Sequence, residues 1–394
     1  MKEKLRKLLN VFSKLKFSKL KFTHKLGFLH KLKFIKRMDR YIIMKFIGTY
    51  FYSIALIISI SIVFDINENL AKFTSYHAPL RAIVFDYYAN FVPYFANLFS
   101  PLFVFIAVIF FTSKLAGNSE IIAMLASGMS FKRLLRPYMI SAALISALNF
   151  YLGSYVIPKG TVVRHDFESL YKNNKKITSA QNVQLQVGKG VIAYISQYDD
   201  KTKTGYGFSL DKFEKKKLIL HTTANVVKYD TISDSRYHWK MVNYKTRDLR
   251  GMREKITSGM EKDTVIMMEP MDLVSKGQQE TFTSPELLRY ISKQQERGSS
   301  NVVQYEVEYH KRIASCFASF ILTIIGVSLS SRKRKGGMGV YLGTGLALSF
   351  AYILLQTVCA TFAINANTPP MLAAWIPNIL YFGIAYLCYR KAPN

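Results

Sequence analysis

The chain has 394 residues, of which half are apolar, and a formal net charge of +29 at pH 7. The apolar residues are gathered in long runs, which excludes a pair of soluble domains and favours a chain that crosses a membrane several times. The enrichment of Lys and Arg on the cytoplasmic side of membrane proteins explains much of this positive charge, so the charge does not indicate nucleic-acid binding.

The first 40 residues form a basic tail, with 14 Lys and Arg residues against two acidic ones. The sequence KLKF occurs in it three times, at 14–17, 19–22 and 31–34. Such a tail can lie on an anionic inner leaflet, where each lysine contributes about 1 kcal/mol. The alternative is an upstream extension without a specific role. A full-length apolar run follows the tail, so we expect no cleaved signal peptide.

Six runs are long and apolar enough to cross the membrane as helices. The first has 24 residues, more than the roughly 20 that span a hydrocarbon core about 30 Å thick. The first three runs belong to a membrane unit at 41–157, and the last three belong to a second unit at 304–394. The predicted spans are 41–64, 93–113, 137–157, 313–331, 339–363 and 371–389.

Charged residues in the connecting loops predict the orientation. Four basic residues lie between spans two and three, and the loop RKRK at 332–335 follows span four. The loop at 364–370 has no basic residue, and the predicted loop at 65–92 has two. Because cytoplasmic loops are enriched in Lys and Arg, we expect both termini in the cytoplasm.

The segment NSEIIAMLASGMSFKRLLRP at 118–137 predicts a short helix between spans two and three. Asn118 or Ser119 can cap it, Glu120 lies in the first turn where the helix dipole favours negative charge, and Gly128 can end it. About nine helical residues extend only some 13 Å, too short to cross a membrane. This helix suits either the membrane surface or the groove of a partner protein. Its apolar face, at i, i+3, i+4 and i+8 spacing, consists of Ile121, Met124, Leu125 and Met129.

Residues 158–303 differ in character from the spans. Apolar and polar residues alternate in three stretches rich in Val, Ile, Thr and Tyr: VQLQVGKGVIAYISQY, KLILHTTANVVKY and YHWKMVNYKTRDL. This alternation is typical of antiparallel β structure with one buried face. Three spans precede the segment, so we expect an all-β domain on the non-cytoplasmic side. A connecting helix is predicted at 284–298, with Ser284 as its cap and Gly298 as its end.

The fifth predicted span carries a signal of close helix packing. Gly339, Gly343 and Gly345 lie along it, and a glycine lets the backbone of another helix approach.

Several kinds of chemistry are excluded by what the chain lacks. Its three cysteines, Cys316, Cys359 and Cys388, fall within predicted spans without a CxxC pair, so we expect no disulfide framework and no metal site. No GxxxxGK[ST] phosphate loop occurs, so the chain cannot supply an ATP site. The cores of the spans have essentially none of the clustered His, Asp or Glu that a membrane enzyme needs, so we expect a non-catalytic protein without a cofactor.

Three separated blocks of the sequence resemble the lipopolysaccharide-export permeases of the LptF/LptG (YjgP/YjgQ) family. The likeness runs from about residue 38 to the C-terminus, with the LptG-like branch slightly preferred. The blocks are DRYIIMKFIGTYFYSIALIISISIVFD, the segment NSEIIAMLASGMSFKRLLRP, and EYHKRIASCFASFILTIIGVSLSSRKRKGGMGVYLGTGLALSFAYILLQ followed by TPPMLAAWIPNILYF.

The resemblance implies a fold of six transmembrane helices with an inserted periplasmic β-jellyroll, in the inner membrane. It implies a permease subunit of an ABC transporter that extracts lipopolysaccharide and passes it to a periplasmic β bridge. The implied partners are a cytoplasmic LptB-type ATPase dimer, a second permease of the family and a single-span LptC-type protein. The segment 118–130 then looks like the coupling helix, with Glu120 facing the ATPase, and spans one and five look like lateral gates.

Two alternatives remain open. One is a permease that moves another lipid or a lipoprotein. The other is a membrane sensor or scaffold whose β domain binds a ligand, which predicts a cytoplasmic output domain. The longest predicted cytoplasmic piece after span one has about 23 residues.

An anionic lipid held at the outer headgroup level needs Lys or Arg there, because charge pairing strengthens near a low-dielectric boundary. Such side chains can equally extend toward ordinary phospholipid or pair with neighbouring acids. The candidate lipid contacts are Lys72, Arg81, Lys159, Arg164, Lys311 and Arg312.

Overall fold

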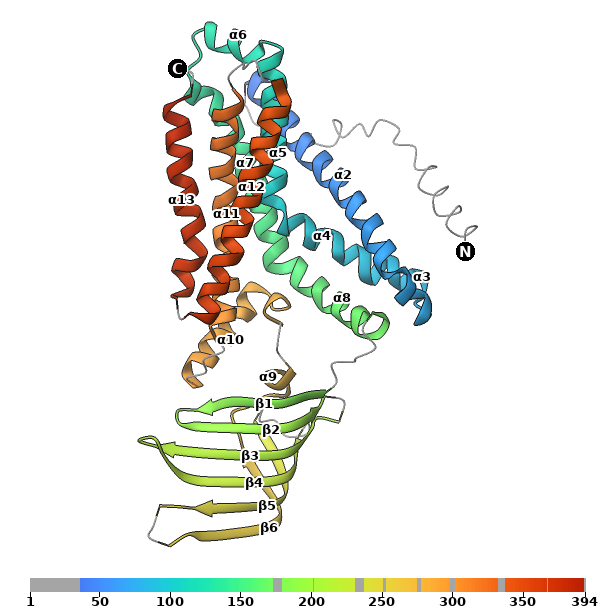
Figure 1. Ribbon diagram of the computed structural model, residues 1–394, viewed down its shortest axis with the longest axis vertical. Helices are drawn as coiled ribbons and strands as arrows, with labels where there is room; N and C mark the ends of the chain where they lie inside the picture. Colours follow the sequence, from blue (N-terminus) through green and yellow to red (C-terminus); the bar gives the residue numbers. More distant parts are fainter. Residues whose placement is uncertain are drawn as a thin grey trace.

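The computed structural model describes residues 36–172, 179–200, 202–230, 237–250, 253–274, 278–297, 302–331, 337–366 and 368–392. The basic tail before residue 36 and the RKRK loop lie outside the described residues. In the described part, six helices are long and apolar enough to cross a membrane. An antiparallel β domain lies between the third and the fourth (Figure 1). The predicted fold class is therefore confirmed.

The described residues that precede the β domain are helical almost throughout. The first span belongs to α2, a single helix of 39 residues. The segment predicted as a loop at 65–92 is instead helical, and the second span begins at Ser100 rather than near residue 93. The elements are α2 (Arg37–Ser75), α3 (Leu80–Ala82), the π-helix η3 (Ile83–Tyr88), α4 (Ala89–Leu98), α5 (Ser100–Gly117), α6 (Glu120–Ala126), α7 (Phe131–Tyr151), the π-helix η4 (Leu152–Val156) and α8 (Ile157–Tyr171).

The second half begins with the β domain and ends with three spans. The predicted connecting helix is present as α10, with Thr283 just before its first residue. The elements are β1 (Ser179–Gly188), β2 (Val191–Asp199), β3 (Thr204–Glu214), β4 (Lys217–Tyr229), β5 (His238–Asp248), β6 (Lys255–Val265), α9 (Pro270–Val274), the 3-10 helix η5 (Gln278–Glu280), α10 (Ser284–Arg297), α11 (Val302–Ser330), α12 (Gly337–Asn365) and α13 (Pro370–Arg390).

Two spans form the centre of the helical bundle. In their most apolar stretches, 78% of the residues of α5 and 61% of those of α11 are buried. A buried amide ties three spans together, because Asn378 of α13 accepts from Tyr352 of α12 at 2.9 Å and donates to the carbonyl of Ala314 of α11 at 2.8 Å. By contrast, only 22% of the corresponding stretches of α2 and α12 are buried, so these two helices lie at the periphery.

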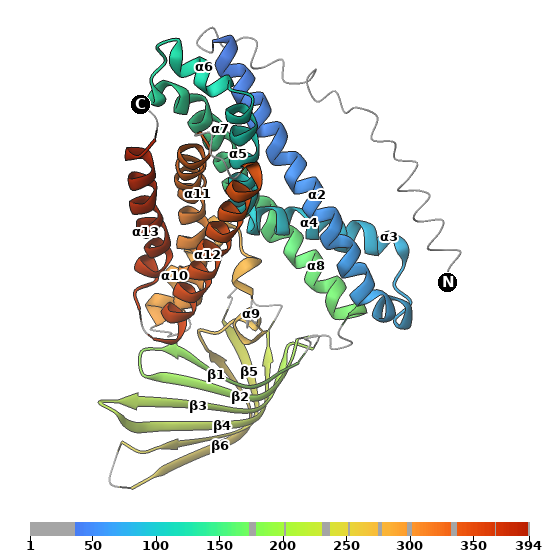
Figure 2. The ribbon, with the colours of Figure 1, turned by 45° about the horizontal axis from the view of Figure 1, so that its top comes forward.

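The outer parts of α2, α4 and α8 diverge from this bundle and meet one another, as Figures 1 and 2 show. They share an apolar cluster of their own, in which the buried side chains are Phe73, Tyr87, Phe91 and Phe167. The chain thus has two helical bodies, a main bundle and a smaller one beside it.

The β domain is a single curved sheet in which each strand pairs with the next, in the order β1 to β6. The strands form because apolar side chains alternate with polar ones and share one buried face, as the sequence predicted. Trp239, Phe208 and Tyr198 lie at the centre of that face. The chain after β6 returns across it: Met268 is buried there, and its carbonyl accepts from the Trp239 indole at 2.9 Å.

Candidate functional site

The short helix at the end of the bundle away from the β domain is α6 (Figure 1). Ser119 precedes it in the left-handed region (φ 61°) and Gly128 follows it at φ 84°, so both ends are sharp turns. Glu120 opens the first turn, where the carboxylate accepts from Asn118 at 3.1 Å. The predicted helix, with its predicted first-turn carboxylate and its glycine end, is therefore present.

The predicted apolar face of α6 packs on the chain itself rather than pointing outward. Ile121 is fully buried in the core that α2, α5 and α7 share, and the structure contradicts its assignment as a partner contact. Met124, Leu125 and Met129 are half-buried against the same core. The outward face instead carries Ile122, which is 49% exposed. Helical spacing identifies an apolar face but does not say whether that face packs on the same chain or on another.

The start of α2 is fastened to both ends of the segment that contains α6. Arg133, in the first turn of α7, donates two hydrogen bonds to the Asp39 carboxylate, at 2.8 and 2.7 Å. This pair is bidentate and only 8% of the Asp39 side chain is exposed. On the other side of α6, the Tyr41 hydroxyl lies 3.5 Å from a carboxylate oxygen of Glu120. The start of α2 thus contacts the residues on both sides of α6.

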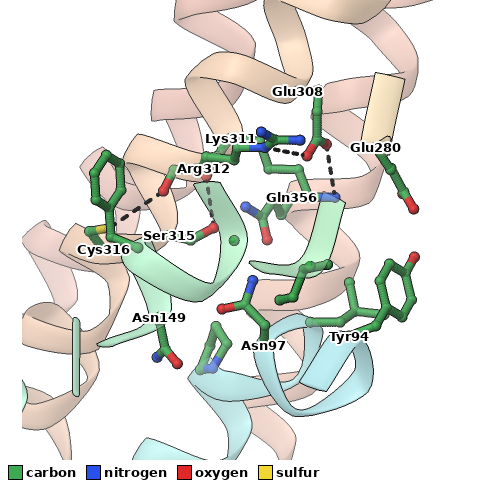
Figure 3. Close-up of a pocket in the computed structure, with 15 residues that line it drawn as sticks. Tyr94, Asn97, Asn149, Glu280, Glu308, Lys311, Arg312, Ser315, Cys316 and Gln356 are labelled. Carbon is green, nitrogen blue, oxygen red and sulfur yellow. Dashed lines mark hydrogen bonds and ion pairs between the residues drawn. The ribbon is translucent and has the colours of Figure 1, made fainter. Parts of the chain in front are cut away.

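At the opposite end of the bundle, an open pocket lies where the main bundle and the smaller helical body meet (Figure 3). Its empty space is about 770 Å³, including the open mouth. One wall comes from the end of α4, the start of α5 and the π-helix η4. The other wall comes from η5, α11 and α12. Apolar and polar side chains are mixed in it; the lining includes Tyr94, Asn97, Leu98, Asn149, Phe150, Gly153, Glu280, Glu308, Lys311, Arg312 and Gln356.

Arg312 lines this pocket, and its guanidinium makes hydrogen bonds within the protein. Its guanidinium donates to Glu308 at 3.0 Å, to the carbonyl of Phe282 at 2.9 Å and to the Ser284 hydroxyl at 3.2 Å, and only 8% of the side chain is exposed. These bonds attach the segment before α10 to α11. The expectation that Arg312 binds lipid conflicts with this geometry, because its donors already have acceptors. Lys311 is freer: it is about a third exposed, and Glu308 lies 3.8 Å away.

The other candidate lipid contacts also comprise one buried residue and several exposed ones. Arg164 is 7% exposed and lies over the ring of Tyr94 at 4.2 Å, with Glu168 at 3.8 Å. The structure therefore gives Arg164 a packing role rather than an open lipid-facing position. The exposed candidates are Lys72 near the end of α2, Arg81 in α3 and Lys159 in α8.

The three glycines predicted to pack helices also differ from one another. A Cβ at Gly345 would clash with a methyl carbon of Ile109 in α5, so this glycine permits close packing of α12 on α5. Gly339 and Gly343 have no heavy atom within 4 Å of the same position. They face open space within the part of the chain that the structure describes.

Several residues of these sites were not found from the sequence. They are Asp39 and Arg133 beside α6, and, towards the other end of α2, Asp65, whose carboxylate accepts from the Tyr88 hydroxyl. A carboxylate at the end of an apolar run is a signal that could have identified Asp65. Among the described residues, no group of three or more His, Cys, Asp or Glu side chains is placed to hold a metal ion.

Two triplets of membrane-spanning helices, a β domain inserted between them and a short helix packed on the first span define a multi-span membrane protein. Comparison with known proteins gives the family: the model of the lipopolysaccharide export system permease LptF/LptG matches residues 40–391, and the chain belongs to that family. The family is one of transport subunits rather than enzymes.

Among curated proteins, the chain is similar to lipopolysaccharide export system permease proteins LptG. It is 21% identical to that of Escherichia coli K12 over 371 residues, which cover 90% of this chain and 98% of the relative. It is 20% identical to that of Haemophilus influenzae over 365 residues, covering 91% and 99%. The similarity thus extends over both helical triplets and the β domain.

Proposed function

We propose that the chain is the permease subunit of an ABC transporter that extracts lipopolysaccharide from the inner membrane and passes it to a periplasmic β bridge. An LptB-type ATPase dimer drives it, paired with a second permease of the same family and an LptC-type single-span protein. The termini lie in the cytoplasm and the β domain in the periplasm. Because both relatives compared are named LptG, we assign the chain the LptG-like role.

One observation carries this proposal: α6 is fastened to the start of α2, and the other end of α2 reaches the helical body that borders the pocket. A force applied to α6 from the cytoplasm therefore displaces α2 and, through it, the helices at the outer end of the bundle. The β domain lies beyond that end, with an apolar face that suits acyl chains (Figure 1).

The contact with the ATPase is expected on the outward side of α6. Glu120 is half-exposed at its start, and Ile122 offers an apolar side chain one position further on. An amphipathic helix presenting such a face suits a groove in a partner. Ile121, which the sequence suggested for this contact, supports α6 from inside instead.

A pull-down with four variants tests this assignment. Glu120→Lys and Ile122→Glu should abolish co-purification of an ABC ATPase in mild detergent while the chain still inserts in the membrane. Lys132→Glu reverses the charge of an exposed residue in the adjacent α7 and should retain the ATPase. Ile121→Glu should lower the amount of folded chain. Full ATPase recovery with both outward-face variants would refute the coupling role of α6.

A second experiment tests the substrate. A photo-crosslinking residue replaces Leu210, which packs against the buried face of the sheet. In vesicles that contain the whole complex, it should label lipopolysaccharide only when ATP is hydrolysed. Labelling of proteins alone would refute the lipid path.

A further inference from the structure

The smaller helical body contains one largely buried carboxylate that bonds to several of its helices. We define this outer arm as the end of α2 (residues 62–75), η3 with α4 (83–98) and α8 (157–171). Its apolar centre is aromatic: the ring centroids of Phe73 and Phe167 are 5.7 Å apart, and those of Tyr87 and Phe167 are 5.2 Å apart. These contacts join α2, η3 and α8 in one cluster.

Asp65 of α2 is the polar connection between these helices. Its two carboxylate oxygens accept from the hydroxyls of Tyr87 at 3.1 Å and Tyr88 at 2.9 Å. The side-chain amide of Asn69 donates to it at 3.0 Å, and the ammonium of Lys172, just after α8, lies 4.0 Å away. Only 15% of the Asp65 side chain is exposed. A largely buried carboxylate with this many partners in an apolar helix indicates a functional role.

The donors on η3 are suited to this carboxylate. Burial, reinforced by the nearby Asp65 charge, raises the pKa of Tyr87 and of Tyr88 well above the ordinary value. Both hydroxyls therefore stay protonated and donate across the pH range in which cells live. The Lys172 ammonium also donates to the Tyr87 hydroxyl, at 3.0 Å, which extends the network to α8.

Two breaks in the chain separate the outer arm from the main bundle. The first is at Phe99, between α4 and α5. The second is η4, a π-helical segment between α7 and α8. π-helical segments occur frequently at functional sites. A Cβ at Gly153 of η4 would lie 3.1 Å from the amide nitrogen of Asn97 in α4, so the glycine lets the two breaks approach each other.

The pocket is lined by Leu98 and Pro101, which flank the first break, and by Gly153 of the second. The helix α2 has no break. The pocket wall opposite the two breaks is fixed, because Arg312 holds the segment before α10 against α11. The 39 residues of α2 extend about 58 Å without interruption. Asp39 ties its start to α7 and Asp65 ties its outer part to the arm. In the most apolar stretch of α2 only 22% of the residues are buried, so this stretch is less tightly packed than α5 or α11.

We propose that the outer arm moves as one rigid body about the two breaks, driven by α2, and that Asp65 is the positioning residue that fastens α2 to the arm. Movement of the arm changes the width of the pocket, because one wall moves while the other is held. This inference rests on the proposed function for the force applied at α6.

The matched variants for the test are Asp65→Asn and Glu68→Gln. Both remove one negative charge from α2, but Glu68 is exposed. They are compared in vesicles that contain the whole ATPase complex and lipopolysaccharide. Two rates are measured together: ATP hydrolysis, and ATP-dependent labelling of lipid from a photo-crosslinking residue at position 210.

Asp65→Asn should keep ATP hydrolysis within about twofold of the unmodified chain and lower labelling about tenfold, because a hydrogen-bonded carboxylate is replaced by a neutral group. Glu68→Gln should change neither rate. Equal labelling by Asp65→Asn and the unmodified chain would overturn the inference. A parallel fall of the ATP hydrolysis and labelling rates would overturn it as well, since it would show that Asp65 supports the fold in general. If Asp65→Asn does not accumulate, Tyr88→Phe takes its place, with a loss of about threefold expected.

A distance measurement separates this inference from the proposed function. Spin labels at positions 72 on α2 and 163 on α8, both exposed, are attached to the full chain after its three cysteines are replaced by alanine. The unmodified chain and Glu68→Gln should give one narrow distance, and Asp65→Asn a broad distribution. A narrow distribution of the spin-label distance in Asp65→Asn would overturn the proposal that Asp65 fastens α2 to the outer arm. Absence of any ATP-dependent labelling in the unmodified chain, with the distances as expected, overturns the proposed function alone.

Discussion

The ion pair between Asp39 and Arg133 is expected to hold the first turn of α2 against α7, and its strength can be measured. The pair is bidentate at 2.8 and 2.7 Å, with 8% of the Asp39 side chain and 26% of the Arg133 side chain exposed. Exposed pairs contribute about 0.2–1 kcal/mol, and loss of one partner of a buried pair costs about 3–5 kcal/mol. With intermediate exposure, we expect a coupling energy of about 1–3 kcal/mol, a factor of roughly 5 to 150 in local opening.

A double-mutant cycle gives this energy directly. The variants are Asp39→Asn, Arg133→Gln and the two together, and the measured quantity is hydrogen exchange of the amides in the first two turns of α2 and α7, where local opening is reported. Each single variant should accelerate exchange, and the double variant should add little beyond either one. Arg136→Gln is the matched control, because Arg136 is exposed on the same helix.

The reasoning would be refuted by exchange rates in the single variants that equal those of the unmodified chain. It would also be refuted if Arg136→Gln accelerated exchange as much as Arg133→Gln, since the effect would then follow net charge alone. An additive double variant would show that the two side chains act independently despite their contact.

Three further outcomes are expected. The pKa of Glu286 is lowered by hydrogen bonds from the hydroxyl and the backbone amide of Thr283. The ionised Glu286 therefore stabilises α10 fully above about pH 4.3, and this stabilisation is lost as pH falls through the lowered pKa. Glu286→Gln should remove this pH dependence from the amide exchange of α10. Gly345→Val should lower thermal stability in detergent by about 1–3 kcal/mol through overpacking, whereas Gly343→Val should not. Trp239→Phe removes the donor to the buried Met268 carbonyl, and hydrogen exchange after β6 should reveal a loss of about 1–3 kcal/mol.

The elements that the sequence predicted well are those with a local signal. A run of about 20 apolar residues has few alternatives to a membrane helix, and strict alternation has few alternatives to a half-buried strand. The short helix α6 was also recognisable, because Ser119, Glu120 and Gly128 mark its ends within ten residues. The segment at 65–92, predicted as a loop, gave a weaker signal, because apart from the end of α2 its helices are short and only partly apolar.

Contacts between distant segments had no such signal. Asp39 and Arg133 are 94 positions apart, and Asp65 meets Tyr88 across a turn that the sequence did not indicate. The apolar side of α6 shows a related limit: Ile121 was correctly assigned to an apolar face, but periodicity alone cannot distinguish a face that packs within the chain from one that packs on a partner.

The candidate lipid contacts can now be sorted by whether their charge is available. Arg312 and Arg164 are nearly buried and have acceptors or a ring against them, so an anionic lipid would have to displace those partners. Lys72, Arg81 and Lys159 are exposed, and all three lie on or beside the outer arm. The part of the chain proposed to move therefore presents three exposed positive charges.

The exposed and the buried candidate residues are therefore expected to have different effects when they are replaced. Replacing Lys72, Arg81 and Lys159 together by glutamine should reduce the lipopolysaccharide that co-purifies with the complex and leave the position of the β domain unchanged, because each is exposed. Arg312→Gln should instead broaden the distance between spin labels on α11 and the β domain, since it loses bonds to the segment before α10. If the triple variant keeps its lipid and Arg312→Gln loses it with unchanged distances, Arg312 is the lipid contact after all and its internal bonds must exchange during transport.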